Sequence, residues 1–261
     1  MKTQLKTLLL LALTLGAAFL YSRHPVEIVL NIKLAKPHFN QLSKSSSFHS
    51  PQEKTSQPHQ PDASEITGQA NHPVDTTHQN ILFFGDSMLE GLCRRFIDYT
   101  EENDHELHTV VWYSSTTKIW AETDTLQHFI RKVSPTFVVI CLGGNELSVN
   151  DLHRRDGYIK AIVRKLGHLP FVWIGPPNWK EDTGINDLII NNVGKERYFE
   201  SRHLELERGS DHAHPTYKAS SVWMDSIAVW LNSQQTAHPL RMNYPRKHVK
   251  SHHVTVLMPL K

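Results

Sequence analysis

Three short polar motifs stand beside apolar runs and carry side chains that can move a proton or stabilise an anion. They are Gly-Asp-Ser at 85–87, Gly-Gly-Asn-Glu at 143–146 and Asp-His-Ala-His-Pro-Thr at 211–216. Together they offer a hydroxyl, a carboxamide, an imidazole and a carboxylate, the groups that acyl transfer through a serine requires. Taken singly, each motif also has an ordinary structural interpretation.

Ser87 is the candidate nucleophile. It follows the apolar run 81–84 through Gly85, which permits a tight turn, and it precedes a segment with helical spacing of apolar residues. A serine at this point lies at a helix N-terminus, where free backbone N–H groups face a developing anion. The alternative is a plain turn with a helix cap, for which serine is also a preferred residue.

Asn145 is the candidate donor to an oxyanion. It follows the apolar run 136–142 through two glycines, which let the backbone approach a ligand closely. A neutral carboxamide suits the stabilisation of a tetrahedral oxyanion. The alternative is an asparagine that only completes a loop turn.

Asp211 and His214 are the candidate acid–base pair. Their spacing lets a loop carboxylate fold onto Nδ1 of the imidazole and leaves Nε2 to accept a proton from Ser87. Pro215 suits the first position of a following helix. His212 is the other candidate base, but its spacing from Asp211 is less suitable. The alternative is a polar loop that precedes a helix.

The elements that must position these groups alternate along the chain from residue 80 to about 233. Strands are expected at 81–84, 109–113, 136–142 and 171–174, with amphipathic helices between them and a last helix from 215. This alternation predicts an α/β fold, a three-layer α/β/α sandwich with a parallel sheet. Ligands of such sheets bind beyond the carboxyl ends of the strands, where the first two motifs lie.

The region 80–235 resembles the SGNH, or GDSL, hydrolase family. The matching blocks are Phe84-Gly-Asp-Ser-Met88, Gly143-Gly-Asn-Glu146 and the motif at 211–216. The resemblance implies the flavodoxin-like SGNH hydrolase fold, with the serine as nucleophile, the histidine as base and the aspartate orienting it. It also implies an oxyanion hole made by the serine N–H, a glycine N–H and the asparagine amide. Carried over, these residues are Ser87, His214, Asp211 and Asn145.

Two positions depart from the family pattern. The stretch 113–118, Tyr-Ser-Ser-Thr-Thr-Lys, lacks the glycine that the family places after the second strand. A backbone N–H of Ser115, Thr116 or Thr117 can still donate to an oxyanion, and Thr116 is the position assigned here, with its two neighbours left open. Glu146 stands where the family usually has aspartate, and we expect a structural role for it.

Both ends of the chain differ from the central region. Residues 1–24 begin with Lys2 and Lys6, and an apolar run follows them. This pattern predicts an export signal or an N-terminal membrane anchor rather than a buried helix. Residues 25–79 are rich in Pro, Ser, His and Gln and predict a flexible spacer. Residues 236–261 carry basic groups and no acid, and we expect a disordered tail; attraction to an anionic polymer or lipid is the alternative.

Composition excludes several functions. The 28 Lys and Arg residues against 26 Asp and Glu leave a net charge of +2, which provides no global field for nucleic acid. A hydrophobic content of 39% excludes a polytopic membrane protein. Cys93 and Cys141 form no disulfide scaffold and are expected to be small buried apolar residues.

The sequence thus predicts an extracytoplasmic serine esterase that removes O-acyl groups, in particular O-acetyl, from an envelope glycan. The expected chemistry needs no metal or organic cofactor, and the N-terminus would tether the domain to the inner membrane. Trp120, Trp173 and Trp179 are candidate platforms for sugar rings, with a core role as the alternative for the first two. An O-acyltransferase of the same fold and a degenerate module that binds glycan or a partner remain as alternative functions.

Overall fold

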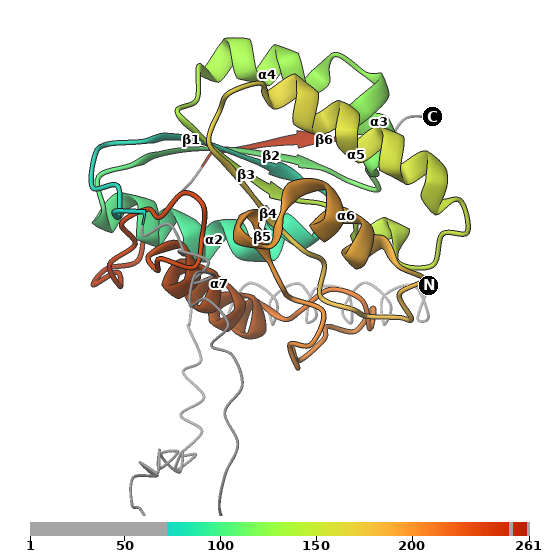
Figure 1. The fold of residues 1–261 in the computed structure, drawn as a ribbon. Coiled ribbons are helices and arrows are strands. Elements are labelled where there is room, and N and C mark those ends of the chain that lie inside the picture. Colours follow the sequence, from blue (N-terminus) through green and yellow to red (C-terminus); the bar gives the residue numbers. More distant parts are fainter. Residues whose placement is uncertain (1–71, 251–252, 260–261) are drawn as a thin grey trace, which may run out of the picture. The chain divides into compact units, whose positions relative to one another are not determined.

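The computed structural model describes residues 72–250 and 253–259 (Figure 1). The segment expected to be an export signal or anchor, and the spacer as far as residue 71, lie outside the described residues. No helix of the described part is long and apolar enough to cross a membrane.

The described residues form a six-stranded sheet in which every pair of neighbouring strands is parallel. The order is β5-β4-β3-β1-β2-β6. The five strands other than β6, read from β2, follow the order 2-1-3-4-5 of flavodoxin-like sheets. The strands are β1 (Asn80–Gly85), β2 (Glu106–Trp112), β3 (Phe137–Cys141), β4 (Phe171–Ile174), β5 (Tyr198–Phe199) and β6 (Val254–Leu257).

Helices cover both faces of the sheet, so the predicted three-layer α/β/α fold is confirmed (Figure 1). One face packs against α2 (Met88–Glu102) and α7 (Tyr217–Leu231). The other packs against α3 (Thr117–Glu122), α4 (Thr125–Val133), α5 (Leu152–Leu166) and α6 (Ile185–Val193). Two short 3₁₀ turns, η1 (Gly144–Glu146) and η2 (Lys195–Arg197), complete the elements.

Strand β3 shows why this sequence folds into layers. Its five residues, Phe-Val-Val-Ile-Cys, are all buried. Because side chains alternate along a strand, Val139 and Cys141 enter the core on the α2 and α7 side, whereas Val138 and Ile140 enter the opposite core. A continuous apolar run of this kind suits a central strand that is covered on both faces. Both cysteines are free and buried, as expected.

The C-terminal segment differs from the expected disordered tail. Strand β6 pairs with β2 over Thr109–Trp112, and Leu240 and Met242 join the core beneath α2 and α7. The chain before β1 also takes part, since Asp75 forms a bridge with Leu240. The Val-Thr-Val-Leu run of β6 is too short to form a strand alone, but the open edge of β2 supplies its hydrogen-bond partners. The disordered-tail prediction is therefore wrong for these residues.

Candidate active site

Strands β1 and β3 carry the first two motifs to the same edge of the sheet. Gly85 and Cys141 are register partners at the ends of these strands. A side chain at Gly85 would place its Cβ only 1.7 Å from the carbonyl oxygen of Cys141, so only glycine fits there. The chain then turns, and half-buried Ser87 becomes the N-cap residue of α2. The free N-terminal amides of α2 begin at this serine.

Asp86 joins the first motif to the second. Its carboxylate accepts hydrogen bonds from the N–H groups of Met88 at 3.0 Å, Gly143 at 3.3 Å and Gly144 at 3.1 Å. Burial raises its pKa to about 6, although the three N–H groups favour the charged form. Asp86 belongs to the first motif, but no role for it was predicted from the sequence. The structure places it as the link that holds the serine turn against the loop of Asn145.

His214 lies between Ser87 and Asp211. Its Nε2 is 2.8 Å from Oγ of Ser87, and its Nδ1 is 2.6 Å from Oδ2 of Asp211. An ionised carboxylate only accepts, so Nδ1 carries the proton and Nε2 accepts from the serine hydroxyl. The hydrogen bond from His214, followed by the N–H groups of Ala213 and His214, holds the pKa of Asp211 well below its usual range. The structure thus brings together the three residues expected as nucleophile, base and orienting acid.

His212 is not placed to act as the base. It adopts a φ of 57°, its side chain is exposed, and no hydrogen bond or ion pair joins that side chain to another residue of the described chain. His214, two residues further on, is the histidine that contacts Ser87. Helix α7 begins at Tyr217, with Thr216 as its N-cap accepting from the amide of Ala219, so Pro215 precedes the helix and is not its first residue.

Arg208 holds the histidine loop in place. Its guanidinium donates to the carbonyl of Ala213 at 2.7 Å and to that of Asn178 at 3.2 Å. The amide of Gly209 also donates to the carbonyl of His214 at 2.8 Å. Arg208 was not predicted from the sequence, because nothing in its local sequence indicates which carbonyls it will reach. It ties the loop of the candidate base to the loop that follows β4.

Among the three candidate amides of the stretch 113–118, which lacks the family's glycine, one is free to serve the candidate oxyanion hole. The N–H of Ser115 donates to Trp112, and the N–H of Thr117 donates to Glu146. The N–H of Thr116 makes no hydrogen bond within 72–250 or 253–259. Of the three amides left open by the sequence, the structure therefore favours Thr116. The exposed Asn145 donates one Nδ2 hydrogen to the carbonyl of Ser115, at 2.9 Å. Its second Nδ2 hydrogen is left to donate to an oxyanion.

The three tryptophans separate into core and surface. Trp120 and Trp173 are fully buried in the core beneath α3, α5 and α6, so they cannot stack on a ligand. Trp179 is 37% exposed, and its indole N–H donates to the carbonyl of Gly144 at 3.1 Å. Only this one of the three lies at the surface next to the loop of Asn145.

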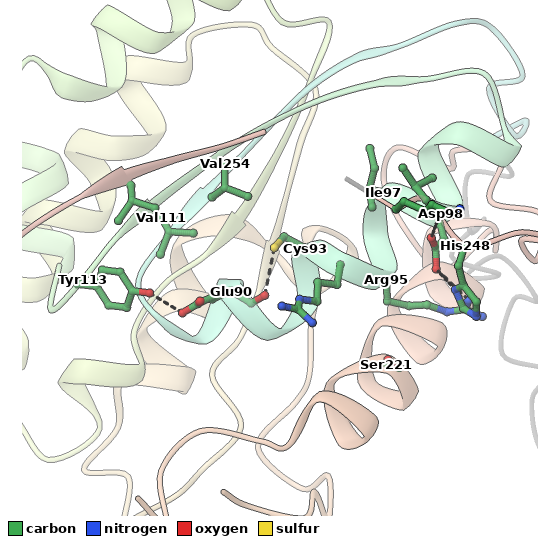
Figure 2. A pocket seen from close by; sticks show the side chains of 14 residues that line it. Glu90, Cys93, Arg95, Ile97, Asp98, Val111, Tyr113, Ser221, His248 and Val254 are labelled. Atoms are coloured by element: carbon green, nitrogen blue, oxygen red, sulfur yellow. Dashed lines mark hydrogen bonds and ion pairs between the residues drawn. The ribbon is translucent and has the colours of Figure 1, made fainter. Parts of the chain in front are cut away.

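One cavity in the described part of the chain is separate from these groups. It has a volume of about 590 Å³ and lies between α2, the end of β2 and the C-terminal segment. Figure 2 shows Glu90 and Tyr113 at one end of it, joined by a hydrogen bond, and Asp98 with His248 at the other. Neither the serine nor the histidine of the candidate site lines this cavity. Within the described residues, no group of three His, Cys, Asp or Glu side chains is arranged to hold a metal ion.

Neither a protein-family model nor a curated protein matches the chain. Among solved structures, an α/β hydrolase from the metagenome of Lake Arreo in Spain is 13% identical, covers 58% of this chain and 94% of its own, and has a TM-score of 0.47. A catalytic mutant of an acetylxylan esterase from Geobacillus stearothermophilus is 10% identical, with 60% and 96% covered and a TM-score of 0.42. The catalytic domain of peptidoglycan O-acetyltransferase A from Streptococcus pneumoniae is 19% identical, with 60% and 95% covered and a TM-score of 0.40.

The topology of the chain itself agrees with the SGNH hydrolase-like fold that the motifs predict. The central sheet has the flavodoxin-like order, and the first two motifs leave it at the adjacent ends of β1 and β3. The third motif lies directly before the last helix, α7. The expected flavodoxin-like α/β/α fold is therefore confirmed.

Proposed function

We propose that the chain is a serine esterase of the SGNH type that cleaves esters through an acyl-enzyme. The observation that supports this most is the continuous hydrogen-bonded series from Asp211 through His214 to Ser87, at 2.6 and 2.8 Å. A serine hydroxyl is a weak nucleophile unless a base takes its proton, and this series supplies an oriented base. A helix cap alone does not explain this geometry, because the Ser87 side chain makes no capping hydrogen bond and contacts His214 of a distant loop instead.

The proposed reaction has two steps. Oγ of Ser87 attacks the ester carbonyl while its proton passes to Nε2 of His214, and the carboxylate of Asp211 stabilises the resulting imidazolium. The carbonyl oxygen, now negative, accepts from the amides of Ser87 and Thr116 and from Asn145. His214 then returns the proton to the leaving alcohol, and water repeats the sequence to release the acid.

We further propose that the ester is a small acyl group, in particular O-acetyl, on an envelope glycan outside the cytoplasm. The exposed ring of Trp179 beside Gly144 supports a saccharide, because an aromatic face can pack on the apolar face of a sugar. The location and the inner-membrane tether rest on the N-terminal sequence, whose pattern is that of an export signal or anchor.

Hydrolysis is favoured over transfer to a second hydroxyl by the openness of the site. The side chains of His214 and Asp211 are 41% and 53% exposed, so water reaches the base directly. An O-acyltransferase uses the same acyl-enzyme but must favour a sugar acceptor over water. The paired base and nucleophile also speak against a degenerate module that only binds a glycan or a partner.

Covalent labelling of the full chain tests the proposal. A fluorophosphonate probe should label the wild-type protein and leave Ser87→Ala unlabelled, and only the wild type should hydrolyse p-nitrophenyl acetate. Addition of an acceptor sugar separates hydrolysis from transfer, since acetylated sugar forms only in the second case. A folded wild-type protein that is neither labelled nor active would refute the esterase proposal.

A further inference from the structure

Glu146 is fully buried, although its neighbour Asn145 is exposed. Its Oε2 accepts from the backbone N–H of Thr117 at 2.7 Å, and its Oε1 accepts from the hydroxyl of the same residue at 2.7 Å. Both carboxylate oxygens therefore bind one residue of the stretch 113–118, which lacks the family's glycine.

Such a buried carboxylate is costly unless it is paired. Nε of Arg155 lies 3.3 Å from Oε1 but is not aligned for a hydrogen bond, so it contributes charge rather than geometry. The same guanidinium also lies 3.3 Å from the carboxylate of Asp151. The two aligned bonds of Glu146 both go to Thr117, which points to a role in shaping the loop after β2.

Two side chains of the second motif hold the loop after β2, one on each side of the Thr116 amide. The side chain of Asn145 binds the carbonyl of Ser115, and the side chain of Glu146 binds the N–H of Thr117. The N–H of Thr116 lies between these two points and has no hydrogen-bond partner among the described residues. The loop contains no glycine and includes Ser114 at a φ of 58°, so it needs such support to keep its conformation.

We propose that Glu146 is a positioning residue for the oxyanion hole. By clamping Thr117, it holds the intervening amide of Thr116 at the site where the substrate oxyanion forms. The inference rests on the proposed esterase function and deepens it. It also joins the two departures from the family pattern, since Glu146 bonds directly to Thr117 within the stretch that lacks the glycine.

Glu146→Asp is the test variant, because it keeps the buried charge near Arg155 but is one methylene too short to reach Thr117. We expect kcat for p-nitrophenyl acetate to fall about 10–100-fold with KM changed less than about twofold, since a misplaced oxyanion donor acts mainly on the transition state. Affinity for phenylboronic acid, which forms a tetrahedral adduct with a serine, should fall in parallel. Glu146→Gln should keep most of the activity, because the side-chain oxygen of glutamine can still accept from the Thr117 amide. The Thr117 hydroxyl would then accept from the glutamine NH2 group instead of donating.

Asp98→Ala is the matched control. Asp98 is another buried carboxylate that holds a loop, through His248 and the amide of Val249, but it is separate from the proposed site. It should lower the midpoint of urea unfolding and leave kcat within about twofold.

The outcomes separate the inference from the function on which it rests. If folded Glu146→Asp keeps wild-type kcat, or if Asp98→Ala loses as much kcat, the positioning role is wrong while the esterase proposal stands. If Glu146→Asp does not fold, Thr117→Pro, which removes the clamped N–H, must show the same loss of kcat or the inference fails. An inactive, unlabelled wild type would instead refute the esterase proposal.

Discussion

Replacing His214 should inactivate the protein, whereas replacing its neighbour His212 should not. In the structure His214 bonds both Ser87 and Asp211, and removing the imidazole leaves the serine with no acceptor for its proton. His212 is exposed and adopts a φ of 57°. The matched pair is His214→Ala and His212→Asn, because asparagine tolerates a positive φ better than alanine does.

The size of the effect follows from the role of each side chain. Loss of the base from a serine–histidine pair costs about 10⁴–10⁶ in kcat, or roughly 5–8 kcal/mol at 1.36 kcal/mol per decade. A surface change that keeps the backbone conformation alters the free energy of unfolding by about 0.5 kcal/mol at most. His212→Asn should therefore stay folded, and its kcat should lie within about twofold of the wild-type value. Asp211→Asn should be intermediate, because the base remains but its tautomer and orientation are lost.

The assay is the burst and steady-state release of p-nitrophenol from p-nitrophenyl acetate, with circular dichroism to show that each variant is folded. Fluorophosphonate labelling gives the acylation step separately. If His212→Asn is the damaging change and His214→Ala keeps its activity, the assignment of the base is wrong. The contact between Ser87 and His214 would then have no catalytic meaning.

Three further predictions concern the framework of the site. Arg208→Met should lower kcat about tenfold, because the loop of the base loses its bond to Ala213, and esterase assays with thermal melts should separate this loss from unfolding. Asp86 has a pKa of about 6 in the fold against an ordinary 3.8, so between these values the folded state holds a proton that the unfolded state has released. The free energy of unfolding should therefore fall with rising pH across that window, by up to about 3 kcal/mol. In Asp86→Asn, urea titrations should show this slope absent, and a wild-type stability that rises across the window would contradict the argument. Truncation after residue 235 should broaden or abolish cooperative unfolding, because it removes Leu240 and β6, and a truncated chain as stable as the full one would show that these residues are dispensable.

Much of the candidate site could be predicted because its signals are local. A glycine, an acid and a serine after an apolar run specify a strand, a turn and a helix N-terminus within seven residues. The Asp-x-x-His spacing likewise selects His214 over His212 without reference to any other segment. The strands at the centre of the sheet were also predictable, since β3 is apolar on both faces and such a run has few other places in a folded chain.

Contacts between distant segments could not be predicted in the same way. Trp120 and Trp173 have the same residue type as Trp179, and only the packing of α3 and β4 decides that the first two are buried. Arg208 donates to carbonyl groups, which every residue possesses, so its targets carry no signature in the sequence.

The sequence by itself determined the α/β fold and the choice of Ser87, Asn145, Asp211 and His214 as candidate site residues, because each choice depends on spacing within one short segment. The tertiary structure alone decided that β6 completes the sheet and that Thr116 keeps a free amide. Both depend on which backbone groups already have partners. That is a property of neighbouring segments in space, because a buried N–H or C=O group must be paired with whatever the fold brings beside it.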